Sequence, residues 1–159
     1  MTRIGTRVGL SLGLALVAFA PLGATAQDQF SVVQAGGIKW AAAPPMVPKG
    51  AQIAVLSGDP GKSGQFVIRL KLPSGYKVPA HTHPTDEEIT VLSGTLNVGM
   101  GDKLDPKKGE ALKAGGFVRM PKGMHHYAWS SGETVIQVSG AGPFEVTYIN
   151  AADDPRKTH

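Results

Sequence analysis

The chain has 159 residues, with 16 Lys and Arg against 12 Asp and Glu, and a formal net charge of +4. The basic residues are scattered, and the densest group, Lys103 with Lys107 and Lys108, lies in a predicted turn, which argues against nucleic-acid binding. The sequence contains no cysteine. Disulfides are therefore excluded, and any bound metal must be held by nitrogen and oxygen donors.

Residues 1–26 have the pattern of a secretory signal peptide. Arg3 and Arg7 precede an apolar run from Val8 to Ala20, and Ala24-Thr25-Ala26 is typical of a cleavage site. We expect the mature chain to begin near Gln27 and to reach the periplasm or the exterior of a bacterium, with no stable membrane insertion after cleavage. The alternative is an uncleaved N-terminal anchor.

Residues 27–50 are predicted to form an extended N-terminal arm. This segment contains Trp40 and the run from Ala43 to Pro48, which has three prolines. Because proline lacks a backbone N–H, the arm can form edge structure at most. Residues 51–150 are expected to form one domain, and residues 151–159 a polar C-terminal tail.

Glycine and proline interrupt the chain often, which favours short strands over long helices. From Gln65 to Leu72, apolar side chains alternate with polar ones, and Phe66, Ile68, Leu70 and Leu72 share one face. Further strands are predicted around Ile53, and at residues 87–92, 95–100, 117–120, 127–129, 134–138 and 144–149. Ser93-Gly94 is expected to join two of them as a hairpin. Eight or nine short strands predict an all-β sandwich or barrel of the jelly-roll type.

Four of the five histidines fall into two clusters, His81-Thr82-His83 and His125-His126. Alternate residues of a strand point to the same side, so His81 and His83 share a face. Glu87 has the same parity if the chain stays extended through residues 84–86, and another strand must supply His126. Three imidazoles and one carboxylate suit a divalent transition metal such as Fe, Mn, Zn, Ni or Cu. The predicted ligands are His81, His83, Glu87 and His126.

Two neighbours of these residues have the opposite parity. Glu88 and His125 are expected to lie beside the site or in solvent, although either could assist it. Each fragment also has a simpler interpretation: exposed strand histidines, a loop pair or a solvated acidic face. The joint pattern favours a metal site because nearly all of the few histidines occupy the required positions.

With their flanking residues, the clusters read Gly75-x5-His81-x-His83-x3-Glu87-x6-Gly94 and Gly115-x5-Pro121-x-Gly123-x2-His126. They resemble the two motifs of the cupin superfamily, over about residues 51–150. The resemblance implies a double-stranded β-helix barrel with an internal metal held by the four predicted ligands. The family's second motif usually closes with Asn, at a non-ligand position where this chain has Ser130. The Trp40 arm and the stretch from Gly75 to Gly94 resemble, more weakly, the cupin domain of zinc-binding anti-sigma factors.

The resemblance implies no single reaction, because cupins include dioxygenases, decarboxylases, isomerases and plain binding proteins. The first hypothesis is a secreted metalloenzyme, such as an oxidoreductase, acting on a small anionic or enolisable organic molecule. The second is a non-catalytic metal- or ligand-binding or sensing module, and the third a purely structural metal. An apolar wall around the metal would favour binding or small-molecule chemistry, whereas a positioned Arg, Gln or Tyr would favour an acid substrate. A homodimer is expected, because an extended arm beside an open barrel edge invites strand pairing.

Overall fold

The computed structural model describes residues 30–157, and the predicted signal segment, residues 1–26, lies outside them. The chain divides into two compact units, Met1–Val32 and Val33–His159. Every strand of the described residues belongs to the second unit. Within the described range, no helix is long and apolar enough to cross a membrane.

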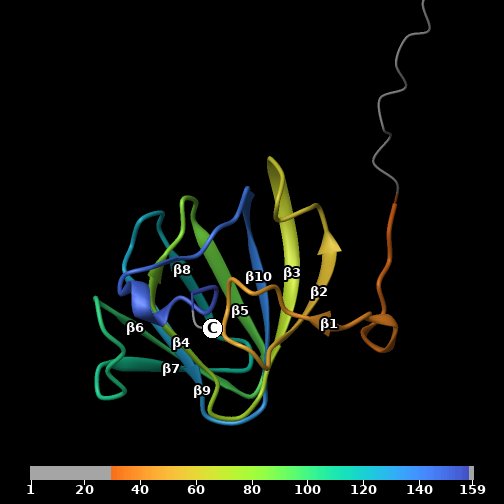
Figure 1. The fold of residues 1–159 in the computed structure, drawn as a ribbon. Coiled ribbons are helices and arrows are strands. Elements are labelled where there is room, and N and C mark those ends of the chain that lie inside the picture. Colours follow the sequence, from red (N-terminus) through yellow and green to blue (C-terminus); the bar gives the residue numbers. More distant parts are fainter. Residues whose placement is uncertain (1–29, 158–159) are drawn as a thin grey trace, which may run out of the picture. The chain divides into compact units, whose positions relative to one another are not determined.

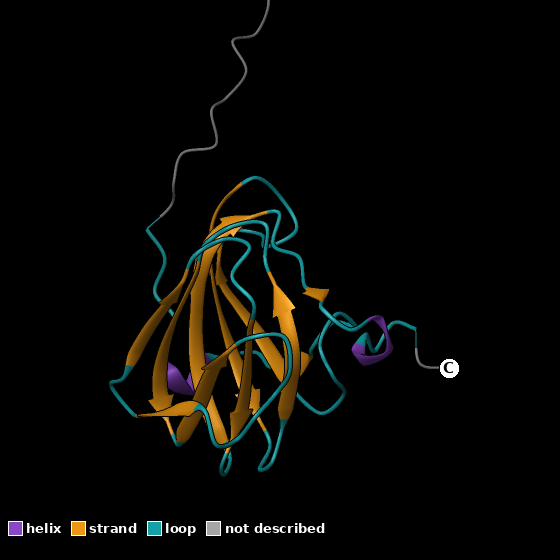
Figure 2. Cartoon of the chain, turned by 90° about the vertical axis from the view of Figure 1, so that its left-hand side faces the viewer, coloured by secondary structure: helices purple, strands orange, loops and turns teal. Residues whose placement is uncertain are grey.

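Two antiparallel sheets build the second unit (Figure 1). The first sheet has the order β1 (Ala41–Ala42), β2 (Gln52–Ser57), β3 (Gly64–Leu72), β10 (Thr134–Gly142), β5 (Glu87–Ser93) and β8 (Phe117–Met120). The second has the order β11 (Thr147–Tyr148), β4 (Lys77–Thr82), β9 (His126–Ser130), β6 (Thr95–Met100) and β7 (Gly109–Lys113). The helices of the described residues are two short 3-10 turns, η1 (Ala35–Gly37) and η2 (Ala151–Asp153) (Figure 2). The predicted all-β jelly-roll barrel is confirmed.

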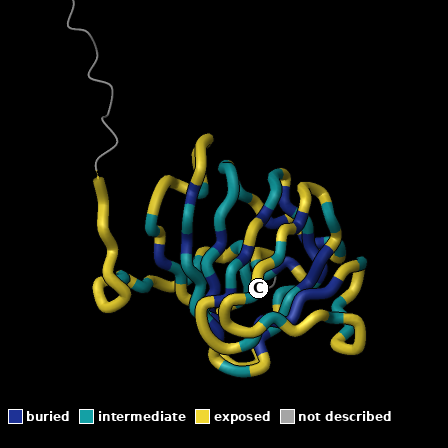
Figure 3. Tube along the Cα trace, turned by 180° about the vertical axis from the view of Figure 1, so that it is seen from behind, coloured by how far each residue is buried: buried dark blue, intermediate teal, exposed yellow. Residues whose placement is uncertain are grey.

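The core lies between the inner faces of the two sheets, where buried segments of the strands gather (Figure 3). The alternation predicted for β3 is confirmed, since Phe66, Ile68 and Leu72 are buried while Arg69 and Lys71 are only partly so. Along one strand, inward side chains alternate with outward ones, so the apolar residues of period two face the partner sheet. The interior between the sheets is therefore the place for a site.

The predicted hairpin of β5 and β6 is wrong. β5 pairs with β10 and β8 in the first sheet, whereas β6 pairs with β9 and β7 in the second. Gly94, between them, has a φ of 78° and lies against Thr134 and the carbonyl of Glu133. At Gly94 the chain therefore crosses from the first sheet to the second. Each of the two strands gains two partners within its own sheet, and the two strands do not pair with each other.

Two large apolar side chains of the barrel strands are exposed. Met100 is 50% and Phe117 57% exposed, whereas Met120 is 2% exposed. Phe117 begins β8, an edge strand of its sheet, and Met100 ends β6, so neither is covered on all sides. The sequence predicted no strand at β7, which forms an edge strand by pairing with β6.

Ser130 replaces the usual Asn of the second motif and binds the turn before β4. Its hydroxyl donates to the carbonyl of Pro73 at 2.6 Å and accepts the N–H of Tyr76 at 3.0 Å. Its backbone N–H and carbonyl bond to Tyr76 and Gly75. The side chain and backbone of Ser130 thus fasten the turn to β9.

Candidate metal centre

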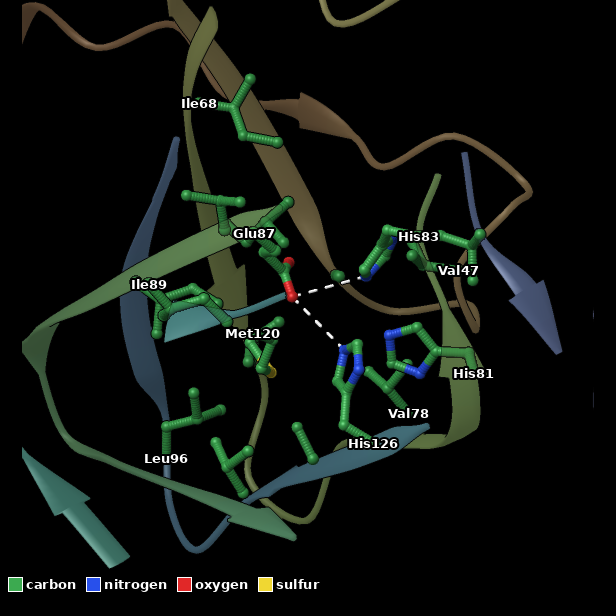
Figure 4. Close-up of a pocket in the computed structure, with 18 of the residues that line it drawn as sticks. Val47, Ile68, Val78, His81, His83, Glu87, Ile89, Leu96, Met120 and His126 are labelled. Carbon is green, nitrogen blue, oxygen red and sulfur yellow. Dashed lines mark ion pairs between the residues drawn. The ribbon is translucent and has the colours of Figure 1, made fainter. Parts of the chain in front are cut away.

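The four predicted ligands come from both sheets and meet inside the barrel (Figure 4). His81 lies near the end of β4 beside His126, the first residue of β9 and its partner in register. His83 follows the end of β4, and Glu87 begins β5 in the other sheet. All four are buried, with exposed fractions between 2% and 7%.

The parity of Glu87 was predicted for an extended segment from Pro84 to Asp86, but this segment is bent. The chain bends at Pro84 and Thr85 between β4 and β5. This bend carries the backbone from the second sheet to the first, so Glu87 approaches the histidines from the opposite wall. The carboxylate and the imidazoles therefore face one another across the interior.

The distances within the cluster suit chelation of one ion. One ring nitrogen from each of His81, His83 and His126 lies within 4.8 Å of the other two. The Oε2 atom of Glu87 is 3.4 Å from the Nε2 atoms of both His83 and His126. Four donors around a single point satisfy the ligand requirement of several transition metals.

Backbone carbonyls orient all three imidazoles. Each Nδ1 atom lies at hydrogen-bonding distance from one carbonyl oxygen: that of Pro79 for His81 at 2.7 Å, of Glu145 for His83 at 2.7 Å, and of Met124 for His126 at 2.9 Å. A carbonyl can only accept, so Nδ1 carries the proton and Nε2 of the neutral ring presents a lone pair. Such a partner on the other nitrogen is a usual feature of metal-binding histidines.

Two inward-facing nitrogens have no hydrogen-bond partner in the part of the chain that the structure describes. The Nε2 atoms of His83 and His126 are buried and unpaired. The carboxylate of Glu87, 3.4 Å from both atoms, is itself an acceptor, so in the neutral tautomer that the carbonyls select, lone pairs face lone pairs. Buried polar atoms without partners are costly, and a cation between them removes that cost. The residues present thus fit a divalent metal ion.

The protonation states favour the same conclusion. Burial, together with repulsion from His126 and His83, lowers the pKa of His81 to about 3. Burial raises the pKa of Glu87, but the imidazoles of His126 and His83 outweigh it and hold that pKa well below its usual range. Burial lowers the pKa of His83, and the adjacent carboxylate of Glu87 more than reverses this, so the pKa of His83 is raised. An ionised carboxylate beside a neutral His81 is part of a ready donor set at neutral pH.

Phe144 is a site residue that the sequence pattern did not reveal. Its ring stacks on the imidazole of His83, with centroids 4.3 Å apart and an interplanar angle of 18°, and contacts Phe66 at 5.1 Å. The next residue, Glu145, supplies the carbonyl that binds Nδ1 of His83. Phe144 follows β10, far from both motifs in the sequence, and only the fold brings it to the site.

Glu88 and His125 lie away from the cluster. Glu88 is exposed and pairs in register with Arg119 and Ser139 on the neighbouring strands. The side chain of His125 is 45% exposed, and its Nδ1 lies 2.5 Å from Oδ1 of Asp102. The structure therefore brings Glu87 and His126, rather than their neighbours, into the interior.

The cluster lines a mainly apolar cavity. The cavity leaves about 70 Å³ in which the centre of a water-sized group can move. Among the described residues, no lysine or arginine lines it, and Tyr76, which does, directs its hydroxyl to the carbonyl of Pro48. Beside the cluster and Tyr76, the lining is Val47, Ala51, Ile68, Leu70, Leu72, Val78, Ile89, Leu96, Val98, Met120, Ala128, Ile136, Val138, Phe144 and Val146.

Two facing antiparallel sheets with histidines converging between them are features of the cupin superfamily. The chain belongs to the ChrR cupin-like domain family, whose model matches residues 28–145. It is also 35% identical to germin-like protein 9-3 of Oryza sativa subsp. japonica over 82 residues, 50% of this chain and 38% of that protein. Germin-like protein subfamily 2 member 1 of Arabidopsis thaliana is 33% identical over 79 residues, 49% of this chain and 36% of that protein. The chain spans well under half the length of these curated relatives.

Solved structures share the fold. The polyketide cyclase RemF from Streptomyces resistomycificus gives a TM-score of 0.64 at 20% identity, covering 80% of this chain and 90% of RemF. A candidate acetylacetone dioxygenase from Methylibium petroleiphilum gives a TM-score of 0.62 at 19% identity, covering 82% of this chain and 88% of that protein. KdgF from Halomonas gives a TM-score of 0.54 at 17% identity, covering 72% of this chain and 96% of KdgF. At these identities the likeness is one of fold.

Proposed function

We propose that this protein is an exported metalloenzyme that binds one divalent transition metal through His81, His83, Glu87 and His126. One observation carries the proposal: lone pairs of buried imidazoles and a buried carboxylate face one another inside an apolar cavity. A cation is the group that such an arrangement accepts. Four protein donors leave positions free for a ligand on an ion that takes six.

The wall of the cavity favours an enolisable substrate over an anionic one. A carboxylate substrate would lose its hydration in the cavity, and within residues 30–157 no lysine or arginine lines the wall to replace that hydration. A small carbonyl compound with an apolar body fits this wall and needs polar contacts only at its oxygens. The name of one structural neighbour, a candidate acetylacetone dioxygenase, agrees with this class, although the argument rests on the wall.

The residues of the chain would hold the metal, orient the imidazoles that bind it and exclude water from the cavity. A divalent metal in this cluster would supply a Lewis acid or a redox centre for the carbonyl oxygens of the substrate. The carbonyls of Pro79, Glu145 and Met124 fix the three imidazoles. Glu87 supplies one negative charge, and the aliphatic wall keeps water from the reacting group.

A non-catalytic ligand-binding or sensing module is the second candidate function. The observation that favours it is the scarcity of polar groups: apart from the cluster, Tyr76 contributes the one hydroxyl to the described lining, and that group is engaged with Pro48. Such a wall binds a molecule readily but provides no separate acid or base for a reaction.

Metal-loaded protein, prepared in parallel with Fe(II), Mn(II), Ni(II), Cu(II) and Zn(II), tests the proposal with acetylacetone as the probe. We expect substrate loss that depends on metal and is abolished by Glu87→Gln but not by the matched variant Glu88→Gln. Metal and acetylacetone binding without turnover would support the binding module. Absence of metal binding would reject both candidates.

Export and dimer formation belong to the same proposal. The pattern of residues 1–26 supports export, and mass spectrometry of protein from bacterial periplasm should give a chain that begins near Gln27. The exposed edge strands β7 and β8 support a homodimer. Light scattering on the purified protein should give twice the mass of the mature chain.

A further inference from the structure

Part of the cavity wall comes from the N-terminal arm rather than from the barrel. Val47 lines the cavity together with the histidines, and in Figure 4 it is drawn on the same side of Glu87 as His83. Pro44 to Pro48, here called the strap, has two exposed residues at its start and partly buried ones from Met46 to Pro48. Val47 therefore separates the interior from solvent.

Few bonds attach the strap to the barrel. Its three prolines carry no N–H, so Met46 and Val47 are its only backbone donors. The N–H of Val47 bonds to the carbonyl of Pro44 within the strap at 3.2 Å. Two tyrosine hydroxyls make the bonds to the barrel: Tyr148 donates to the carbonyl of Met46 at 3.0 Å, and Tyr76 donates to that of Pro48.

Phe144 and Val146, which also line the cavity outside the strands, are held more firmly. Phe144 stacks on His83, and its N–H donates to the carbonyl of Pro60 at 2.7 Å. Val146 is buried, and its carbonyl accepts from Nη2 of Arg156 at 3.0 Å. By comparison, no side chain of the strap is fully buried. Local opening begins where burial and hydrogen bonding are least, which here is the strap.

Both tyrosines also lie beside the site. Tyr148 is the register partner of His81, with ring centroids 6.0 Å apart, and Tyr76 lines the cavity. Behind the strap, Gly50 has a φ of 111°, a left-handed conformation that favours glycine. The two residues that hold the strap thus lie beside the site, Tyr148 against His81 and Tyr76 in the cavity lining.

We propose that the strap is the gate of the metal cavity, that Val47 sets the size of the ligand admitted, and that Tyr76 and Tyr148 are positioning residues that latch the gate. This inference deepens the proposed function and rests on it. It assigns substrate selection to the arm, while the barrel holds the metal.

Ligand size tests the role of Val47. Protein loaded with Co(II) is titrated with azide, acetylacetone and 1-phenylbutane-1,3-dione, and binding is followed in the visible spectrum of the metal. Val47→Trp should weaken the binding of acetylacetone about tenfold or more and leave the binding of azide unchanged. Val47→Ala should strengthen the binding of the phenyl compound by a similar factor. Val55→Trp, at an exposed valine outside the lining, is the matched control.

Loss of one latch should speed access to the metal. Tyr76→Phe and Tyr148→Phe should each raise the rate at which EDTA removes Co(II) by about two- to tenfold, the value of one hydrogen bond. Tyr127→Phe is the control, because its hydroxyl binds the carbonyl of Asp105 at 3.3 Å, away from the strap. Circular dichroism verifies that every variant is folded.

The outcomes separate the two proposals. Binding of Co(II) and azide with no change of selectivity in the Val47 variants would overturn the gate and leave the metal site intact. Equal rates of Co(II) removal by EDTA in the Tyr76, Tyr148 and Tyr127 variants would overturn the latch roles of Tyr76 and Tyr148 and leave the metal site intact. Failure of wild-type protein to bind Co(II) would reject the proposed function, and the gate with it.

Discussion

At the scale of single residues, the centre depends on which nitrogen of each imidazole is engaged. The carbonyl partners of Nδ1 turn Nε2 of His83 and His126 inward, where both are buried without partners. Glu87 then sets the charge of the site. An ionised carboxylate without a cation would be costly to bury, so its removal should affect metal binding more than folding.

Replacement of Glu87 by Gln should lower the affinity for Zn(II) by about 100-fold or more, since a charged donor is lost from inside the cavity. Competition with a chromogenic chelator measures the affinity. Glu88→Gln changes the same group one residue later on the exposed face and should stay within about twofold of wild type. A larger loss for Glu88→Gln than for Glu87→Gln would move the ligand by one residue.

The pKa of His81 predicts how acid affects the metal-free protein. Its folded value is about 3 and its ordinary value 6.5, so the unfolded chain binds a proton that the folded chain does not. The free energy of unfolding should therefore fall as the pH drops below 6.5, by about 2 kcal/mol at pH 5. His83, whose pKa is raised, acts in the opposite direction. Its contribution to the free energy of unfolding is present below pH 6.5 and is lost at higher pH.

Urea unfolding of metal-stripped protein at several pH values between 7.5 and 5 measures this dependence. His81→Gln should flatten the slope below pH 6.5, because the titrating group is gone. An unchanged slope in that variant would show that another group causes the acid sensitivity.

At the scale of elements, the turn at Gly94 decides the architecture. A Cβ there would lie 2.4 Å from the carbonyl oxygen of Glu133, at a φ of 78°. Gly94→Ala should lower the free energy of unfolding by about 2 kcal/mol or more, whereas Gly132→Ala, which meets nothing within 4 Å, should change it little. Calorimetry compares the two, and equal stability would contradict the account of this crossing.

The sequence predicted the strands better than their partners. The alternation in β3 is local and marks an inner face, so it could be read directly. The crossing at Gly94 could not, because a short Ser-Gly turn also suits a hairpin and only the ladders of four other strands distinguish the two. For the same reason β7, a polar edge strand, was missed.

The candidate site was predictable as far as its motifs reach. Parity placed His81 and Glu87 toward the interior, although a bend rather than an extended segment brings Glu87 there. Phe144 and Val47 lie outside both motifs, because their role comes from tertiary packing of segments distant in the chain.

At the scale of the whole barrel, the metal would join the two sheets. The histidines belong to or follow strands of the second sheet, and Glu87 begins a strand of the first. Zn(II) at 100 times its dissociation constant should therefore stabilise the protein by about 2.7 kcal/mol. Differential scanning calorimetry should give a higher unfolding temperature with Zn(II) but not with Mg(II), which prefers oxygen donors. An equal rise with both ions would point to non-specific binding.

Metal content tests the central claim most directly. Wild-type protein and the variants His83→Ala and His125→Ala are purified from periplasm under the same conditions, and elemental mass spectrometry counts the transition metal per chain. We predict about one ion per chain in wild type and in His125→Ala, and loss of nearly all metal in His83→Ala, since one of four donors is removed from the buried cluster. Full metal content in His83→Ala would contradict the account.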